Sequence, residues 1–131
     1  MRMLEDDESN NDVEVSWADQ QSINSFSRLN NLLTDAEATL RAKVTEKEGL
    51  DEIAEEIELV DEEEEVMYRV GDAFVYVKQE RAIEMLKRDG EKLEEEIEKL
   101  RKQASECEEG MEKLKVGLYA KFGSNINLER D

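Results

Sequence analysis

The chain has no histidine, no proline and one cysteine, and aromatic residues make up only 5% of its 131 positions. Histidine is the most frequent general acid or base and a common metal ligand, so its absence disfavours the usual catalytic constellations. The lone cysteine, Cys107, cannot form an internal disulfide, which suits a reducing compartment. We therefore expect a protein that is not an enzyme and that uses no cofactor and no metal.

Long apolar runs are missing as well. None approaches the roughly 20 residues of a transmembrane helix, and the N-terminal residues 1–8 contain no apolar core of a secretory signal. Acidic residues outnumber basic ones by 36 to 18, which gives a net charge of −18. Nucleic acids and anionic membrane surfaces repel such a chain. We expect no nucleic acid and no membrane among its partners, and a cytoplasmic location, with the nucleus left open.

Charged residues are abundant at 41%, and helix-favouring residues dominate, a composition typical of long helices and coiled coils. Ser16 and Asp19 resemble a capping box with Asp in place of Glu, and they predict a helix over residues 16–60. Apolar residues in this segment alternate by steps of three and four, as in the seam of a coiled coil. They are Phe26, Leu29, Leu33, Ala36, Leu40, Leu50, Ala54 and Ile57, with Lys43 and Lys47 as polar members.

A second helix is predicted over residues 79–122, where Gly123 makes a natural stop. Its seam runs without a slip through Ile83, Leu86, Gly90, Leu93, Ile97, Leu100, Ala104, Cys107, Met111, Leu114 and Leu118. At 1.5 Å per residue both helices would be about 65 Å long. Helices of equal length joined by a short connector fold back on each other. The predicted fold is mainly α: a long antiparallel α-helical coiled-coil hairpin with a β-hairpin at the bend.

The β-hairpin is predicted over residues 66–77, where β-branched and aromatic residues flank Gly71-Asp72. Glycine in the first position favours a type II′ turn. In that register one face carries Val66, Tyr68, Val70, Ala73, Val75 and Val77, and the other carries Met67, Arg69, Phe74 and Tyr76. A lone hairpin with two apolar faces is marginal in water and needs neighbours. The hairpin therefore indicates a subunit of an oligomer.

Several features have a structural and a functional interpretation. The ten acidic residues of segment 51–65 suit a metal ion, but no spaced calcium-loop pattern is present, so we favour a solvated helix end and loop. Cys107 occupies a seam position, where a small buried residue is expected, and no histidine is available to activate it. Gly90 and Gly110 are either hinges or tolerated interruptions. Residues 1–15 are expected to be an acidic disordered tail, and 123–131 a C-terminal tail.

Three segments resemble one protein family: Trp17–Asn24, Arg69–Phe74 and Leu118–Glu129. They are similar to the β-class subunits of prefoldin, in particular the subunit-four type, over nearly the whole chain. The resemblance implies a heterohexamer in which this chain joins two α-class and three further β-class subunits. It also implies a co-chaperone that captures unfolded proteins of the actin and tubulin type and delivers them to the cytosolic chaperonin without ATP. The absence of a phosphate-binding loop motif agrees with this.

Two sets of site residues follow. The hairpin residues expected to assemble the complex are Val66, Tyr68, Val70, Phe74, Val75 and Val77. The residues expected to contact clients at the distal tips are Val13, Val15, Trp17, Leu118, Tyr119, Phe122, Ile126 and Leu128. Alternatively, Trp17, Leu118 and Phe122 close the helical seam. Ile126 and Leu128 lie beyond Gly123 and are expected to be more available, so truncation after Phe122 should weaken client holding.

A rival function is open at this point. A structural coiled-coil adaptor would homodimerise and recruit partners through its acidic surface, without holding clients. Two apolar-faced strands at the bend separate the two functions, because an adaptor gains nothing from them whereas a subunit that assembles through its hairpin requires them.

Overall fold

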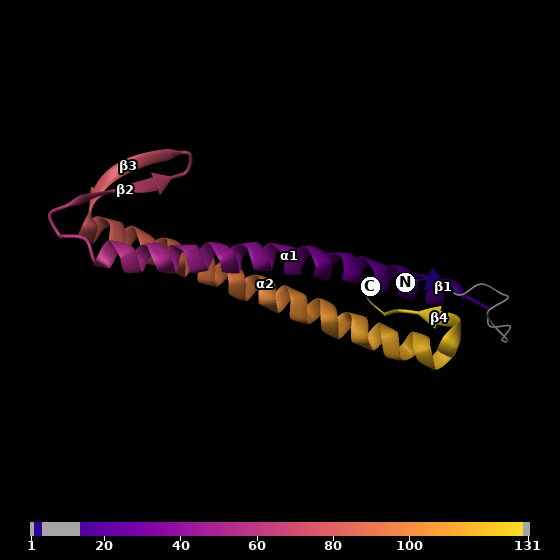
Figure 1. Cartoon of the computed structure of the whole chain (residues 1–131). Coiled ribbons are helices and arrows are strands. Elements are labelled where there is room, and N and C mark those ends of the chain that lie inside the picture. The colour runs from indigo at the N-terminus through magenta and orange to yellow at the C-terminus, as the bar shows by residue number, and fades with distance from the viewer. Residues whose placement is uncertain (1, 4–13, 130–131) are drawn as a thin grey trace. The chain divides into compact units, whose positions relative to one another are not determined.

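A computed structural model of the chain describes residues 2–3 and 14–129. Two long helices, of 42 and 44 residues, are connected by a two-stranded antiparallel β-hairpin, which confirms the predicted fold class (Figure 1). The elements in chain order are β1 (Arg2–Met3), α1 (Trp17–Glu58), β2 (Glu65–Val70), β3 (Ala73–Lys78), α2 (Gln79–Phe122), the 3-10 turn η2 (Gly123–Asn125) and β4 (Ile126–Asn127). Most of the expected acidic tail, residues 1–15, lies outside the described residues.

The chain divides into two compact units. The terminal unit consists of residues 1–37 and 102–131, and the hairpin unit consists of residues 38–101. Each unit therefore contains one stretch of α1 and one stretch of α2, running in opposite directions along the chain. The β-hairpin belongs to the hairpin unit, and the short strands β1 and β4 belong to the terminal unit.

The start of α1 follows the predicted capping box. The Asp19 N–H donates to Oγ of Ser16 at 3.1 Å, and the Ser16 N–H donates to Oδ2 of Asp19 at 3.0 Å. These reciprocal bonds satisfy two backbone donors near the start of the helix. The helix begins at Trp17 and ends at Glu58, slightly inside the expected range 16–60.

The end of α1 is capped by a residue from the start of α2. Gln79 is buried, and its side-chain amide donates to the carbonyl oxygens of Ile57 at 3.1 Å, Glu58 at 3.4 Å and Val60 at 2.9 Å. The last carbonyls of a helix have no partner within the helix, so this amide replaces the missing donors. One side chain thereby connects the two helices at the point where the hairpin emerges.

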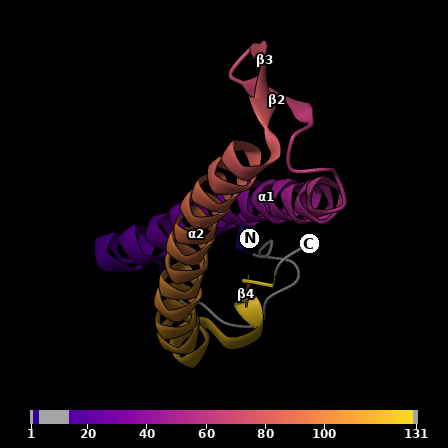
Figure 2. The ribbon, with the colours of Figure 1, turned by 90° about the vertical axis from the view of Figure 1, so that its left-hand side faces the viewer.

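The hairpin has the predicted register and turn. Tyr68 lies opposite Val75, and Val66 lies opposite Val77. Gly71 has a φ of 62°, and among the described residues positive φ occurs only at glycines, so Asp72 has a negative φ. This combination is that of a type II′ turn. In the turned view of Figure 2 the two strands lie beside the first turns of α2.

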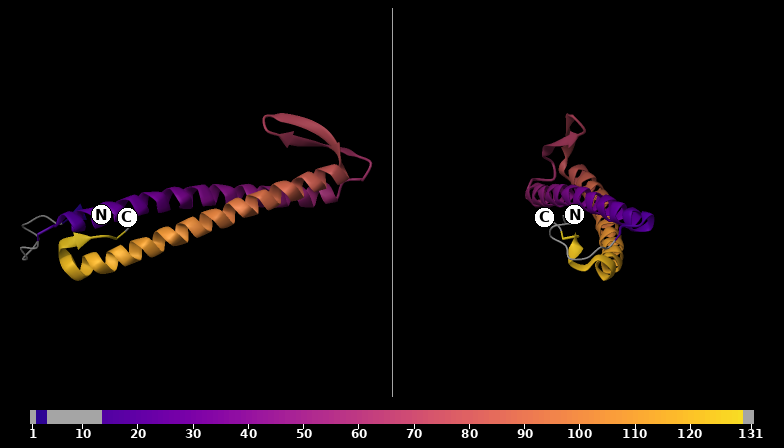
Figure 3. Two further views of the ribbon diagram at one scale, coloured as in Figure 1. Left: turned by 180° about the vertical axis from the view of Figure 1, so that it is seen from behind. Right: turned by 90° about the vertical axis from the view of Figure 1, so that its right-hand side faces the viewer.

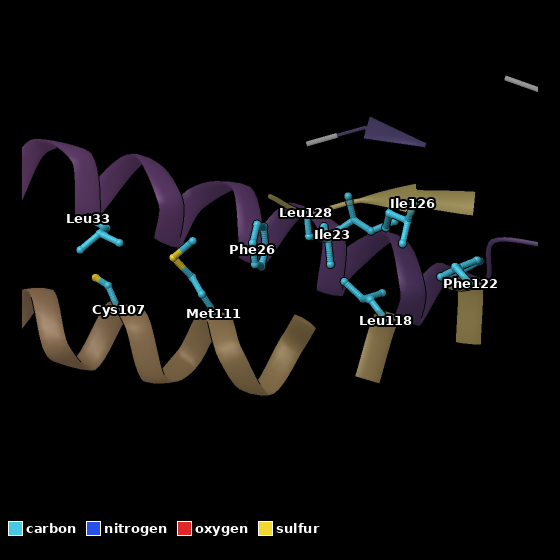
Figure 4. Close-up of a cluster of buried hydrophobic side chains, with 9 residues drawn as sticks. All are labelled: Ile23, Phe26, Leu33, Cys107, Met111, Leu118, Phe122, Ile126 and Leu128. Atoms are coloured by element: carbon cyan, nitrogen blue, oxygen red, sulfur yellow. The ribbon is translucent and has the colours of Figure 1, made fainter. Parts of the chain in front are cut away.

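Each unit has its own apolar core. The core of the terminal unit is a cluster of nine buried residues (Figure 4): Ile23, Phe26, Leu33, Cys107, Met111, Leu118, Phe122, Ile126 and Leu128. The hairpin unit buries Ile57, Tyr68, Ala82 and Leu86 against one another. Cys107 is a buried core residue, as its seam position predicted.

The predicted polar layer of the seam is bridged by charge. Lys43 on α1 forms a salt bridge with Glu96 on α2 at 3.0 Å, and this contact raises the pKa of Lys43. Lys47 pairs with Asp51 on its own helix at 2.8 Å. Two lysines in an apolar seam are thus accommodated by pairing with carboxylates close to the surface.

Two sequence-based exclusions can be compared with the structure. Within residues 14–129, neither long helix contains a stretch apolar enough to cross a bilayer. The acidic side chains of the described ranges do not converge into a group of three or more that can hold a metal ion. The acidic residues of segment 51–65 are all exposed.

Candidate functional site

One face of the β-hairpin is an exposed apolar surface. Its three large apolar side chains are Met67, Phe74 and Tyr76, which are 58%, 61% and 70% exposed, and Arg69 lies on the same face. Met67 and Tyr76 lie directly opposite each other across the two strands, and Phe74 lies two residues before Tyr76 on the same face. Exposed apolar surface of this kind marks an interaction site. We call Met67, Phe74 and Tyr76 the hairpin outer face.

The opposite face of the hairpin is partly used within the chain. Tyr68 is buried against α2, and its hydroxyl donates to Oδ2 of Asp89 at 2.6 Å. Burial, and then the hydrogen bond to this carboxylate, raises the pKa of Tyr68 well above its usual value. Val66 and Val77 are half-buried in the same cluster. Tyr68 therefore anchors the hairpin to its own helix.

The expected assembly set is accordingly divided by the structure. Val70, Phe74 and Val75 are exposed, whereas Tyr68 is buried inside the chain. The sequence analysis places Met67 and Tyr76 on the same face as Phe74, but the expected set contains only Phe74 from that face. The alternation of side chains along each strand would have found them, because it places apolar residues on both faces of the hairpin.

Both strands of the hairpin also have an unpaired edge. Within the described residues the sheet contains only β2 and β3, so each strand pairs on one side alone. Open edges offer backbone donors and acceptors to another strand. A hollow of about 810 Å³ lies between the hairpin and the adjoining turns of α1 and α2, and Ile53, Met67 and Phe74 contribute to its lining. The hairpin unit thus presents apolar side chains, free edges and a hollow together.

The terminal unit exposes fewer apolar side chains than the sequence suggested. Trp17 is 78% exposed, and Val15 and Val116 are exposed as well. Leu118 and Phe122 are buried and Tyr119 is half-buried, so Leu118 and Phe122 close the seam, as the alternative interpretation held. Trp17 does not close the seam. Val13 lies outside the described residues.

The expectation that Ile126 and Leu128 are more available is wrong. Ile126 is 4% exposed and Leu128 is 1% exposed. Gly123 has a φ of 54°, which ends α2 and reverses the chain, and the extended segment after it returns between α1 and α2 (Figure 3). Its β4 strand pairs with β1. Gly123 was interpreted only as a helix stop, and the alternation of apolar residues beyond it was not used.

Polar contacts hold the returning segment. The Leu128 N–H donates to Oη of Tyr119 at 3.0 Å, and Lys115 forms a salt bridge with Glu129 at 3.1 Å. The hydrogen bond from Lys115 lowers the pKa of the Glu129 carboxyl group and raises the pKa of Lys115. Lys121 pairs with Asp19, which connects the end of α2 to the start of α1 and holds the pKa of Asp19 low.

These features can be compared with known proteins. The family described as "Prefoldin subunit" matches residues 20–125 of the chain. Prefoldin subunit 4 of Saccharomyces cerevisiae is 42% identical over 99% of this chain and 100% of its own length. This chain belongs to the prefoldin subunit family. Prefoldin subunit 4 of Homo sapiens is 38% identical over 92% of this chain and 90% of its own length.

A solved structure shares the fold. The prefoldin beta subunit from Thermococcus strain KS-1 superposes with a TM-score of 0.72 at 19% identity, covering 82% of this chain and 94% of its own. Prefoldin subunits are chaperones rather than enzymes, and they assemble with other prefoldin subunits. The chain is therefore a subunit of the prefoldin co-chaperone type, and the hairpin outer face with its free edges is the candidate site of assembly.

Proposed function

We propose that this prefoldin subunit is an ATP-independent holding component of a heterohexamer. Its partners are two α-class and three further β-class subunits, and the complex captures unfolded proteins of the actin and tubulin type and delivers them to the cytosolic chaperonin. The proposed location is the cytoplasm, with the nucleus as a second compartment. The observation that carries the proposal is the hairpin outer face, whose apolar side chains no residue within 2–3 and 14–129 covers.

Assembly through the hairpin is favoured because the hairpin without a partner is only marginally stable. A two-stranded sheet is marginal in water, and exposed Met67, Phe74 and Tyr76 add an apolar surface that favours a partner. The first turns of α2 already hold the hairpin through Tyr68 and Asp89. The hairpin is thus pre-ordered, which lowers the entropy lost when another strand joins its edge.

We assign client holding to the terminal unit because that unit exposes large apolar side chains to solvent. Among the described residues, the large apolar side chains that this unit leaves in solvent are Val15, Trp17, Leu32 and Val116. The strong negative charge of the chain keeps such exposed apolar groups from driving self-association. Delivery to a chaperonin requires a partner surface, and the acidic helix faces are available for it.

Substitutions on the hairpin outer face also test the rival proposal, a homodimeric adaptor. Phe74→Lys places a charge on the hairpin outer face, and Leu59→Lys is the matched control, because Leu59 is exposed but lies between α1 and β2. We expect a tagged Phe74→Lys chain to lose its partner subunits while Leu59→Lys retains them. Equal recovery of partners with both variants, or a homodimer with the unmodified chain, would favour the adaptor.

A further inference from the structure

The terminal unit contains an apolar groove that is filled by the end of its own chain. Residues 126–129, here called the C-terminal strap, lie between α1 and α2 (Figure 3). Two strap side chains, Ile126 and Leu128, are buried among core residues from both helices. Those helix residues are Ile23, Phe26, Leu33, Met111 and Leu118. Without the strap, the same helices would present a continuous apolar groove at this end of the seam.

The strap is held in the way that an extended peptide is held in a binding groove. Its alternating residues Ile126 and Leu128 enter the groove, while Asn127 between them is exposed. The Leu128 N–H is bound by Tyr119, and the Glu129 carboxylate meets Lys115. The pattern is apolar, polar, apolar, acidic. Nothing in these contacts requires that the segment belong to the same chain.

The contacts at the end of the strap are also weak enough to exchange. The Glu129 side chain is exposed, and solvent-exposed ion pairs stabilise a protein little. A space of about 440 Å³ lies beside Leu128 and Glu129 and is lined by Phe26, Leu33 and Met111 among others. An incoming segment can therefore contact the groove before the strap has left it.

We propose that the C-terminal strap is an exchangeable internal ligand that covers a client-binding groove. The groove takes an extended segment of non-native polypeptide with two apolar residues separated by one position and followed by an acidic residue. This inference rests on the proposed holding function and adds a covered groove to the exposed side chains that contact clients in the terminal unit. The strap leaves the groove when such a segment replaces it, so the apolar surface is exposed only when a client is present.

The strap lowers the apparent affinity of the groove. A ligand that binds only the open state has its affinity reduced by the fraction of molecules that are open. A tethered strap also competes at an effective concentration in the millimolar range. Weakening the strap therefore strengthens binding of an added segment. This result is opposite to the loss of holding expected when the tail itself is the contact surface.

The test uses the full-length chain assembled with its partner subunits and a labelled peptide with the sequence of residues 123–131. Leu128→Asp expels the strap, because a carboxylate cannot be buried among the core residues. Ser124→Asp is the matched control, because it adds the same charge to the same segment at an exposed position. We expect Leu128→Asp to bind the peptide about tenfold more tightly than the control or the unmodified chain, as burial of one leucine predicts. Fluorescence anisotropy measures the affinity.

Equal affinity of Leu128→Asp and Ser124→Asp for the peptide would overturn the proposal. If Leu128→Asp loses helix content by circular dichroism, Glu129→Gln decides, because it weakens only the surface contacts of Glu129 with Lys115 and the Tyr119 hydroxyl. That variant should bind the peptide about two- to fivefold more tightly, and no change in affinity would overturn the proposal.

A separate measurement distinguishes this inference from the proposed function. Suppression of client aggregation by the unmodified complex tests holding, whatever the peptide does. If the unmodified complex suppresses aggregation and neither strap variant changes peptide affinity, the strap proposal fails and the holding function stands. If the complex suppresses nothing, the holding function fails, and the peptide affinities still show whether the strap exchanges.

Discussion

The side-chain amide of Gln79 joins the start of α2 to the end of α1. It donates to three carbonyl oxygens at the end of α1, and it is buried. Gln79→Leu keeps a similar volume and removes both donor hydrogens. Each hydrogen bond contributes roughly 1 kcal/mol, and a carbonyl left without a partner adds a desolvation cost, so we expect a loss of about 2–3 kcal/mol.

The assay is urea unfolding followed by far-ultraviolet circular dichroism, with the free energy of unfolding extrapolated to water. Gln103→Leu is the matched control, because it makes the same substitution at an exposed position of α2. Gln79→Leu should also weaken assembly, since the hairpin emerges beside the capped end of α1. A difference between the two variants below about 0.5 kcal/mol, the range of ordinary surface substitutions, would refute the reasoning.

Three further predictions concern single positions. Gly49→Ala should stabilise the chain by up to about 1 kcal/mol, because Gly49 lies inside α1 and a Cβ there would meet open space. An unchanged or lower midpoint of urea unfolding would contradict this. Tyr68→Phe should lower the free energy of unfolding by about 1 kcal/mol, because only the hydrogen bond to exposed Asp89 is lost. It should also remove a tyrosine whose pKa is raised, and a spectrophotometric titration that finds no such tyrosine in the unmodified chain would argue against this. Folding lowers the pKa of the Glu129 carboxyl group. The stability that its ionised form contributes is therefore present above the usual pKa of 4.5 and is lost as pH falls through the lowered pKa. The difference in urea midpoint between the unmodified chain and Lys115→Gln should therefore narrow below about pH 4.5, because the pair is lost there in both; an unchanged difference would contradict this.

The helices and the hairpin were predictable because their signals are local. Steps of three and four along the seam set the period of each helix, and Ser16 with Asp19 set the start of α1. A glycine at the first turn position set the register of the hairpin, and alternation set its two faces. Each of these signals spans a few residues, so sequence alone contains it.

The missing parts depend on contacts between distant residues. The burial of Leu128 requires Phe26 on α1 and Tyr119 on α2, and no local pattern states that the tail turns back to them. The use of Tyr68 inside the chain depends on Asp89, a partner 21 residues away. The cap provided by Gln79 is likewise invisible in a pattern of apolar residues. The two long helices and the β-hairpin could therefore be predicted, whereas β1, β4 and the exposure of individual residues could not.

The central claim is that the hairpin outer face brings this chain into a hexamer of prefoldin subunits. The most direct test is the native mass and subunit composition of the complex recovered with a tagged full-length chain. The account predicts about 90 kDa, six chains near the 15.2 kDa of this one, with two α-class and three other β-class subunits present. A monomer, or a homodimer with unrelated partners, would contradict it and leave only the fold.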